Sequence, residues 1–540
     1  MAITEVSNLV TWTFSGTYDQ DRPVLIDAAN TDRYITKRHA SNLVLDLAGA
    51  FDRDSTICLH LANDVLYPIL VLATLASKCR WTGTNPAYTA SELSHHFHIS
   101  ECKYVITETK DVDTVQKAVD MSGVDLEIIV FEDLLAIEVH SAGHFHTMPP
   151  SATQLNGLHR HKCKRSLRQL LSNHTAFNLE TVTRGISLSD TAALMQTSGT
   201  TGLPKLAARS HHSMISEQQA IEDNNSSKPY EVRRLYCTPI FHSFAAPEMI
   251  FNALRLGQTS YFMRRFDDTF AQKIHDLGIT ETFGAPPMFA HLIAQPNARM
   301  LLQGLKAIYF GGAPLAPELR RQMLNLFEGE SKPRIVPVYG MTEGGWFTTL
   351  KHDQVDDTGS LGKPIPGYEL KLSPCPKTNI MDAQLVGEIL IRGPQLMTGY
   401  HSDSQATAAM FEGDWLKTGD VGYFRDGKIY LVDRAKDLIK VNGWQVSPAE
   451  LEDVLLQHPD VRDAAIVGVG EGVDEHPAAC VVAGRADLTE ETVRVHLRAR
   501  LASYKISRTE VRFVKAIPKN AAGKILRNCL RGVVTTAVET

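Results

Sequence analysis

The chain contains little that suggests a metal centre, a disulfide framework or a disordered protein. Of its 540 residues, 43% are hydrophobic and only 7% are aromatic, which is too hydrophobic for a disordered chain. Its eight cysteines are scattered without a CxxC pair, so neither a zinc cage nor a dense disulfide framework is indicated. We interpret His95, His96 and His98 as a solvated helix face and not as a metal site. Reduced thiols fit an intracellular compartment, so we expect a cytoplasmic location.

A strong net charge and a long hydrophobic run are also missing. The 55 basic and 61 acidic residues give a formal net charge of -6, which supplies no whole-molecule attraction to nucleic acid or anionic lipid. The most apolar early segment, residues 65–76, would span about 18 Å as a helix, whereas a bilayer core is about 30 Å thick. We interpret it as a buried helix that is broken near Pro68. We therefore expect no nucleic-acid partner and no integral membrane association, and the oligomeric state stays unknown.

Short apolar runs alternate with helical patterns along the chain, which is typical of α/β architecture. Candidate buried strands lie at residues 104–107, 126–131, 307–310 and 387–392. A chain of 540 residues is too long for one hydrophobic core. We predict an α/β fold with a large N-terminal domain of mixed β-sheets flanked by helices and a smaller, mobile C-terminal α+β domain.

The last hundred residues or so have the pattern of a separate domain. Ser447, Pro448 and Glu450 supply an N-cap, a first-turn proline and the third-position acid of a capping box. Strands at 464–469 and 478–483 and a helix at 490–501 follow this start signal. The predicted organisation is an N-terminal domain at 1–432, a hinge at 433–436 and a C-terminal domain at 437–540.

The strongest local signal is the segment TSGTTGLPK at residues 197–205. Its backbone N–H groups, hydroxyls and single ammonium could surround a phosphate chain. It is not a Walker loop, because Pro204 stands where a glycine is required and Leu206 where a magnesium-binding hydroxyl is required. Taken alone, the segment could also be an ordinary polar turn.

Four further motifs follow in order: YGMTE at 339–343, WLKTGD at 415–420, DRAKD at 433–437 and PKNAAGK at 518–524. With TSGTTGLPK they strongly resemble the adenylate-forming superfamily of acyl-CoA synthetases, peptide-synthetase adenylation domains and luciferases, and most of all its 4-coumarate:CoA ligase branch. The resemblance implies an AMP-forming acid–thiol ligase that makes an acyl-adenylate and then a CoA thioester. ATP, Mg2+ and CoA would be its cofactors, and a carboxylic acid its substrate.

The resemblance also assigns the ATP site. Attack of a carboxylate on the α-phosphate gathers negative charge, so cations and N–H groups must be in place beforehand. The 197–205 loop would hold the β- and γ-phosphates, Thr342 would contact the α-phosphate, and Glu343 would hold Mg2+. Tyr339 would stack on adenine and Asp420 would hold the ribose. The ATP/AMP set is Thr197, Ser198, Gly199, Thr200, Thr201, Gly202, Lys205, Gly311, Gly312, Ala313, Pro314, Tyr339, Gly340, Asp420 and Arg434.

Lys524 and His242 join Thr342 and Glu343 in the catalytic set that the resemblance implies. Lys524 would bridge the acyl carboxylate and the α-phosphate during adenylation only, and Lys436 would be the pivot of the hinge. His242, in TPIFHSF, matches the histidine that flanks the carboxylate. A lone histidine in an apolar run is otherwise more often a core residue, and we assign it no general-base role.

The acceptor and acid sites also follow from the resemblance. Within KVNGWQ, the CoA-binding residues would be Lys440, Gly443 and Trp444, and the acid pocket would be formed by Ser243, Phe244, Trp346 and Phe347. Coumarate-type ligases usually carry small residues where Trp346 and Phe347 stand. Two rings there would remove volume and favour a compact aryl acid, of benzoate or pyridine-carboxylate size, over a short or medium-chain alkyl acid as runner-up. The alternative is that both rings point into the core.

Two other enzymatic functions stay open at this point. An enzyme that loads an acyl group onto a carrier protein and a luciferase-like oxygenase share all the ATP motifs. A catalytically inactive binding module would need the loss of an essential residue. None of Lys205, Glu343, Asp420, Arg434 and Lys524 is missing.

Overall fold

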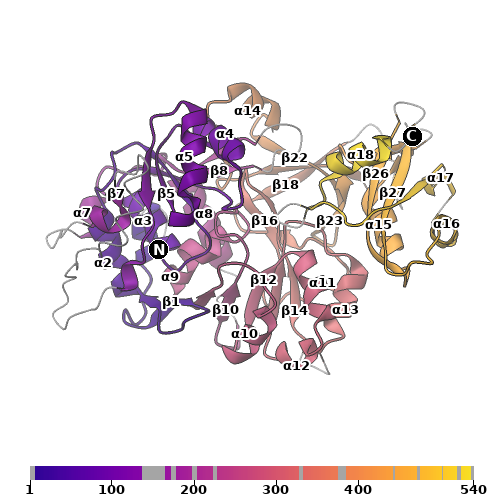
Figure 1. The fold of residues 1–540 in the computed structure, drawn as a ribbon, viewed down its shortest axis with the longest axis horizontal. Coiled ribbons are helices and arrows are strands. Elements are labelled where there is room, and N and C mark those ends of the chain that lie inside the picture. Colours follow the sequence, from indigo (N-terminus) through magenta and orange to yellow (C-terminus); the bar gives the residue numbers. More distant parts are fainter. Residues whose placement is uncertain are drawn as a thin grey trace. The chain divides into compact units, whose positions relative to one another are not determined.

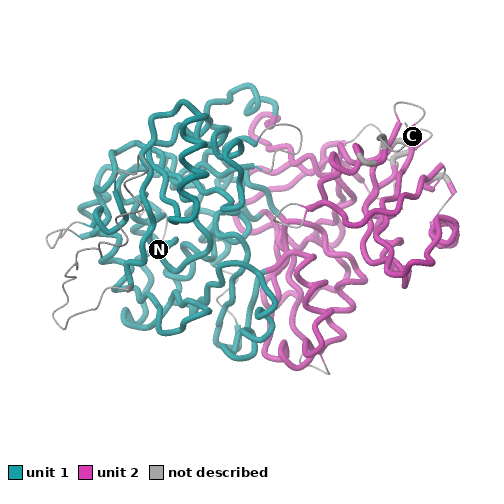
Figure 2. The backbone as a smooth tube through the Cα atoms, viewed as in Figure 1, with its two compact units in different colours: residues 1–283, 340–346, 393–409 teal, residues 284–339, 347–392, 410–540 magenta. Residues whose placement is uncertain are grey.

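The computed structural model divides the chain into two compact units (Figure 2). Unit 1 comprises residues 1–283, 340–346 and 393–409, and unit 2 comprises residues 284–339, 347–392 and 410–540. Mixed β-sheets with flanking helices confirm the predicted α/β class, whereas the predicted boundary at 433–436 stays a prediction. The structure describes residues 7–136, 165–171, 178–197, 204–222, 228–327, 332–374, 385–441, 444–470, 475–501, 503–506, 508–519 and 524–536.

The larger sheet of unit 1 has eight strands (Figure 1). They are β3 Thr56–His60, β4 Arg80–Gly83, β5 Cys102–Thr107, β6 Glu127–Val130, β7 Arg165–Ser166, β8 Thr191–Gln196, β9 Leu206–Ser210 and β20 Gly399–Tyr400. Their order is β20-β9-β8-β4-β3-β5-β6-β7. Strands β4, β3, β5 and β6 run parallel, whereas β8, β9 and β20 pair antiparallel at one edge. Strand β3 is buried along its whole length, as parallel strands covered on both faces are.

A second group of strands in unit 1 has the order β12-β10-β11-β1-β2. Their bounds are β1 Pro23–Asp27, β2 Tyr34–Thr36, β10 Arg233–Tyr236, β11 Thr259–Phe262 and β12 Glu281–Gly284. Four charged side chains are buried here and pair with one another: Arg234 with Glu248 and Glu281, and Glu281 with Lys228. Such charges are tolerated in an interior because each has a partner of opposite sign.

Helices cover these sheets. Among them are α1 Leu9–Phe14, α2 Lys37–Leu47, α3 Tyr67–Ala76, α4 Ala90–Ser100, α5 Val112–Ser122, α8 His211–Glu222, α9 Ala253–Leu256 and α10 Phe270–Asp276. Every residue of α3 is buried, as predicted for this segment. The predicted break near Pro68 is wrong, because this proline lies in the first turn, where its missing N–H is not needed.

An antiparallel sheet lies in the middle of unit 2. Its strands are β18 Glu369–Pro374, β19 Val386–Arg392, β21 Phe411–Glu412, β22 Trp415–Arg425 and β23 Lys428–Arg434. Their order is β18-β19-β22-β21, and β23 pairs with β22. The parallel pair β13 Ala307–Phe310 and β14 Arg334–Pro337 and the helices α11 Pro286–Ala294, α12 Ala298–Leu301 and α13 Pro317–Leu324 belong to the same unit.

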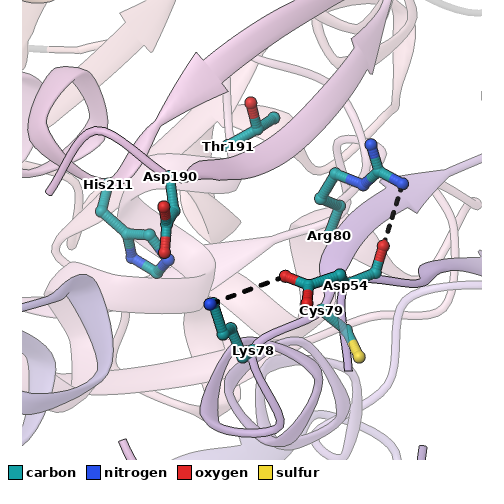
Figure 3. A pocket seen from close by; sticks show the side chains of 7 residues that line it. All are labelled: Asp54, Lys78, Cys79, Arg80, Asp190, Thr191 and His211. Atoms are coloured by element: carbon teal, nitrogen blue, oxygen red, sulfur yellow. Dashed lines mark hydrogen bonds and ion pairs between the residues drawn. The ribbon is translucent and has the colours of Figure 1, made fainter. Parts of the chain in front are cut away.

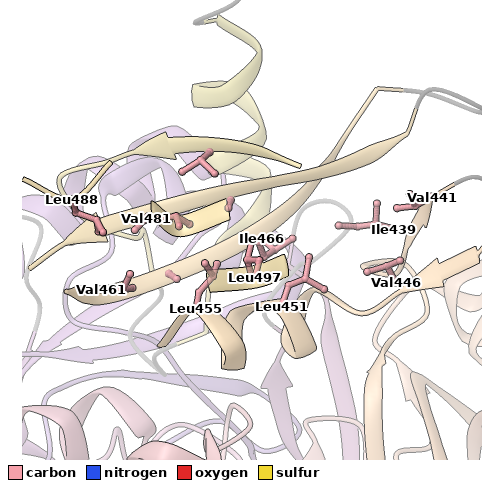
Figure 4. Packing of buried hydrophobic residues seen from close by; sticks show 14 residues of the cluster. Ile439, Val441, Val446, Leu451, Leu455, Val461, Ile466, Val481, Leu488 and Leu497 are labelled. Carbon is pink, nitrogen blue, oxygen red and sulfur yellow. The ribbon is translucent and has the colours of Figure 1, made fainter. Parts of the chain in front are cut away.

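The C-terminal part of unit 2 has its own core around β26 Val461–Val469, β27 His476–Ala483 and β28 Glu510–Phe513. Alternation along β26 sends Ile466 toward Leu451, Leu455 and Leu497 of α15 Pro448–Leu456 and α16 Glu490–Arg498 (Figure 4). The opposite face packs against α18 Arg527–Thr536. No helix in the described part of the chain is long and apolar enough to cross a membrane.

Helix α15 begins where the sequence predicts. Ser447 is its N-cap and accepts a hydrogen bond from the backbone N–H of Glu450, and Pro448 lies in the first turn. The capping box is only half formed, because the carboxylate of Glu450 pairs with Lys505.

Candidate active site

The 197–205 loop connects β8 to β9, which form an antiparallel hairpin with Gln196 opposite Leu206. The N–H of Thr197 donates to the carbonyl of Lys205 at 2.8 Å, and the N–H of Lys205 donates to the Thr197 hydroxyl at 3.1 Å. The two ends of the loop are therefore held together by the strands. The residues between them that were assigned to phosphate binding, Ser198, Gly199, Thr200, Thr201 and Gly202, lie outside the described residues.

Two histidines of α4 hold both ends of this loop. Nε2 of His95 lies 3.1 Å from the carbonyl oxygen of Pro204, and Nδ1 of His96 lies 3.0 Å from the side-chain oxygen of Gln196. The other nitrogen of His96 contacts the Thr82 hydroxyl at 3.1 Å. Burial lowers the pKa of His96 to about 3, so this ring is neutral. The expectation of a solvated face is thus wrong for His96, which is buried. Within the described residues no group of three or more His, Cys, Asp or Glu side chains could hold a metal ion.

Lys205 and Glu343 meet at Tyr400 of β20. The Lys205 ammonium lies 5.3 Å from the centre of the Tyr400 ring and 3.7 Å from the carboxylate of Asp403. The Tyr400 hydroxyl donates to Oε1 of Glu343 at 2.7 Å. Burial and the nearby Glu343 raise the pKa of Tyr400, so its hydroxyl stays protonated as a donor. Sequence reasoning missed Tyr400, since its contact with Glu343 is made across 57 residues.

The turn at residues 340–346 presents Thr342 and Glu343. It connects β15 Tyr339–Met341 to β16 Gly345–Thr349, and Glu343 is buried while Thr342 is partly exposed. A Cβ on Gly340 would lie 2.0 Å from the carbonyl oxygen of Gly345. Gly345 has a φ of +74°, and a Cβ there would lie 1.9 Å from the carboxylate of Glu217. Both positions therefore require glycine, and the turn is packed tightly against its surroundings.

Trp346 packs against the loop that carries His242. Its ring lies 6.3 Å from Phe244 in a stacked arrangement and 6.1 Å from Phe283. The indole N–H donates to the carbonyl of Phe244 at 2.9 Å, and the N–H of Phe244 donates to Nδ1 of His242 at 3.2 Å. Desolvation lowers the pKa of His242, which favours the neutral imidazole. Ser243 lies in the same loop and is partly buried.

Phe347 lies on the other face of β16. It packs edge-on against Tyr339, with ring centres 5.7 Å apart, and against Tyr368 at 5.3 Å. Successive side chains of a strand point in opposite directions, so Trp346 and Phe347 cannot line one wall. The expectation that both rings limit the same acid pocket is therefore corrected: Trp346 alone lies beside Phe244, and Phe347 lies beside the predicted adenine residue.

Asp420 and Arg434 lie opposite each other on β22 and β23. Nε of Arg434 is 3.1 Å from Oδ1 of Asp420, and the Tyr339 hydroxyl donates to Oδ2 at 2.8 Å. Burial raises the pKa of Asp420, while Arg434, the Tyr339 hydrogen bond and Lys524 oppose this shift. The structure thus brings together four residues that were predicted for ribose, adenine and phosphate binding: Asp420, Arg434, Tyr339 and Lys524.

Lys524 adds a second cation to this cluster. Desolvation, Arg434 and Lys436 lower its pKa to about 8, while Asp420 and Asp437 act in the opposite direction. Partial desolvation and Arg434 also lower the pKa of Lys436, although this residue is exposed. The charges of three cations therefore act on one buried carboxylate, an arrangement that an incoming phosphate would stabilise.

The remaining predicted positions are more dispersed. Gly311, Gly312, Ala313 and Pro314 follow β13, and Gly312 has a φ of +82° that suits glycine. Lys440 and Trp444 lie on the paired strands β24 Ile439–Val441 and β25 Trp444–Val446, whereas Gly443 lies outside the described residues.

The predicted hinge begins at Asp433, which is bound to the start of α15. Its Oδ2 accepts hydrogen bonds from the Ser447 hydroxyl at 2.6 Å and from the N–H of Ala449 at 3.2 Å. The end of β23 is therefore tied to the N-terminus of the helix that follows the hinge.

A small polar pocket elsewhere in unit 1 contains none of the predicted site residues (Figure 3). Its charges are partly satisfied internally: Lys78 lies 3.8 Å from Asp54, and Arg80 donates to the Asp54 carbonyl at 3.1 Å. Both acidic and basic groups line it, so its lining favours no ligand of one charge. Its lining residues are Asp54, Lys78, Cys79, Arg80, Asp190, Thr191 and His211.

A family model described as AMP-binding enzyme matches residues 15–401, and one described as AMP-binding enzyme C-terminal domain matches residues 450–524. The chain belongs to the AMP-binding enzyme family. Membership of the adenylate-forming superfamily, predicted from five motifs, is confirmed.

This AMP-binding enzyme has full-length relatives. It is 47% identical over 532 residues to the acyl-CoA ligase M9 of a Phoma species, covering 97% of this chain and 95% of that protein. It is 36% identical over 544 residues to the phenylacetyl-CoA ligase epaB of Aspergillus niger, covering 97% and 96% of the two chains. Its fold is similar to that of the anthranilate CoA ligase AuaEII in complex with anthranoyl-AMP, with a TM-score of 0.79, 20% identity and coverage of 100% of both chains.

Proposed function

We propose that this AMP-binding enzyme joins a compact aryl carboxylic acid to CoA through an acyl-adenylate. The broader activity, that of an AMP-forming acid–CoA ligase using ATP and CoA, rests on the family match and on relatives named acyl-CoA ligases that align over nearly the whole chain. The nature of the acid rests on the surroundings of Trp346.

The packing of Trp346 carries the proposal of a compact acid. Its ring packs against both Phe244 and Phe283, next to the loop that presents His242. The hydrogen bond from its indole to the Phe244 carbonyl holds the ring in this position. Displacing such a wall to admit a longer acid would cost about 1 to 3 kcal/mol. A relative named phenylacetyl-CoA ligase supports a single-ring acid.

In unit 1, Lys205 and the 197–205 loop would hold the outer phosphates, and Thr342 would contact the α-phosphate. The Glu343 carboxylate, kept in place by Tyr400, is suited to Mg2+, which needs only one or two protein carboxylates beside phosphate oxygens and water. Glu343 would hold Mg2+ there, and the ion would supply positive charge that offsets the charge of the phosphates.

In unit 2, Lys524 and Arg434 would neutralise charge as the carboxylate attacks the α-phosphate and pyrophosphate leaves. Asp420 would accept the ribose hydroxyls, since Tyr339 and Arg434 fix its two oxygens. Rotation about Lys436 would then exchange Lys524 for the Lys440–Trp444 segment, beside which CoA would enter. These roles remain predictions for each residue.

The decisive experiment is a substrate panel. The purified chain is incubated with ATP, Mg2+, CoA and one acid from a panel of benzoate, nicotinate, phenylacetate, hexanoate and 4-coumarate, and products are identified by mass. We expect a CoA thioester of a single-ring acid, and AMP in equal amount. Thioester formation on a carrier protein but not on CoA would favour the loading enzyme, and oxygen-dependent light emission would favour the luciferase-like alternative. A preference for 4-coumarate would contradict the compact pocket.

A further inference from the structure

We propose that Glu217 is a positioning residue for adenylation, because it fixes the turn at residues 340–346. The proposal rests on the proposed function for its activity assay. It adds a residue that none of the five motifs contains. Glu217 acts through the backbone of Trp346 and is not itself a catalytic residue.

Each carboxylate oxygen of Glu217 has a separate task. Oε2 lies 2.9 Å from a guanidinium nitrogen of Arg209, and Oε1 accepts the backbone N–H of Trp346 at 3.0 Å. Glu217 belongs to α8 and Arg209 to β9, so the pair connects this helix to the strand that follows the phosphate loop. Gly345 lets the turn approach the carboxylate so closely that a Cβ would collide with it.

The Arg209–Glu217 pair is sealed from solvent, with side chains only 2% exposed. Burial raises the pKa of Glu217, while Arg209 and the Trp346 N–H oppose the shift. Arg209 also donates to the Ser213 hydroxyl at 3.3 Å. A buried pair of this kind contributes little net stability compared with apolar residues, so holding a defined geometry is its better-founded role.

Hydrogen bonds lead from this pair to both parts of the site. Glu217 accepts a hydrogen bond from the backbone N–H of Trp346, and the indole N–H of Trp346 donates to the Phe244 carbonyl. The backbone N–H of Phe244 in turn donates to His242. Thr342 and Glu343 precede Trp346 in the same tight turn. A shift of Trp346 would therefore move the Glu343 carboxylate and the loop that carries His242 together. A misplacement of about 1 Å can lower a reaction rate about 100-fold.

Two matched double variants distinguish the positioning of Trp346 by Glu217 from the effect of the Arg209–Glu217 ion pair. Arg209→Met with Glu217→Gln removes both charges but keeps an amide oxygen that can accept the Trp346 N–H. Arg209→Met with Glu217→Met removes the charges and the acceptor. Neither leaves a buried charge without its partner. Thermal unfolding is measured for both, and kinetics are compared well below the lower midpoint.

The readouts are acid-dependent ATP–pyrophosphate exchange across a Mg2+ titration, and acid-free binding of ATP with Mg2+ by calorimetry. We expect the Gln variant to stay within about threefold of wild type, and the Met variant to lose about 100-fold in exchange and to need more Mg2+. Thioester formation from supplied acyl-AMP should fall much less. Equal losses in both variants would assign the effect to the ion pair, and wild-type behaviour of the Met variant would show that Glu217 positions nothing; either result overturns the proposal.

A third variant tests the proposal independently, in case the double variants do not fold. Gly345→Ala leaves both charges in place but adds a methyl group against the Glu217 carboxylate at a left-handed position. It should reproduce the raised Mg2+ requirement, and wild-type kinetics would overturn the proposal. If none of the acids tested supports pyrophosphate exchange by the wild-type protein, the proposed function fails. Binding of ATP with Mg2+ then still tests the role of Glu217.

Discussion

The two units hold their predicted catalytic groups in different ways. In unit 1, Glu343 is fixed by the hydroxyl of Tyr400, and its turn by Glu217 and two glycines. In unit 2, Arg434 pairs with Asp420, and desolvation together with the charges of Arg434 and Lys436 lowers the pKa of Lys524. The unit 1 groups are held by hydrogen bonds and close packing, whereas the unit 2 groups carry charges that are costly until an anion arrives.

This difference predicts that substitutions in unit 1 disturb geometry and substrate choice, and that those in unit 2 separate the two half-reactions. The largest effect is expected for Lys524→Ala. Adenylation, followed by pyrophosphate release, should fall about 100-fold or more, because the lysine stabilises charge that develops only in that step. CoA transfer from supplied acyl-AMP is the control and should be nearly unchanged. Equal losses in both steps would remove the distinction between the units.

Lys436→Pro tests the hinge in unit 2. Proline limits φ to about -65° and removes an N–H, so the rotation between half-reactions should be blocked. We expect adenylation to persist while CoA thioester formation falls at least about tenfold. The adenylation rate is measured as pyrophosphate release, and the rate of CoA thioester formation is measured by mass spectrometry. Unaltered rates in both steps would mean that the pivot lies elsewhere.

The pH dependence of adenylation sharpens the comparison further. With a pKa of about 8, Lys524 is mostly protonated at pH 7 and mostly neutral at pH 9. Because adenylation needs the ammonium, kcat/KM for ATP should fall about tenfold between these pH values. Lys524→Arg keeps its charge throughout this range and should abolish the fall, whatever its absolute rate. A wild-type profile that is flat up to pH 9 would contradict the charge cluster.

The smallest effect is expected for the aromatic wall of unit 1. Trp346→Ala opens space beside Phe244, so kcat/KM for 4-coumarate relative to benzoate should rise about tenfold. The truncation also costs about 3 to 5 kcal/mol of stability, so assays are run below the measured unfolding temperature. Phe347→Ala is the matched control, because its ring lies on the other face of β16. An equal change of preference in both variants would refute a wall formed by Trp346.

The periodic elements could be predicted from the sequence, whereas the contacts between distant residues could not. Strand β13 matches its prediction to the residue, and α15 begins at the predicted Ser447. The burial of His96 escaped prediction because its partner Gln196 is 100 residues away. Strand alternation alone could have separated Trp346 from Phe347, but the family resemblance had grouped them.

The anchoring of Tyr400 has a consequence for synthesis of the chain. Strand β20 pairs with β9, and the Thr398 hydroxyl reaches the Ala208 carbonyl across 190 residues. At translation rates of about 5 to 20 residues per second, β9 is synthesised roughly 10 to 40 s before its partner strand β20. During that interval the ribosome-bound chain exposes an open β-edge, which is the kind of surface that chaperones protect from aggregation.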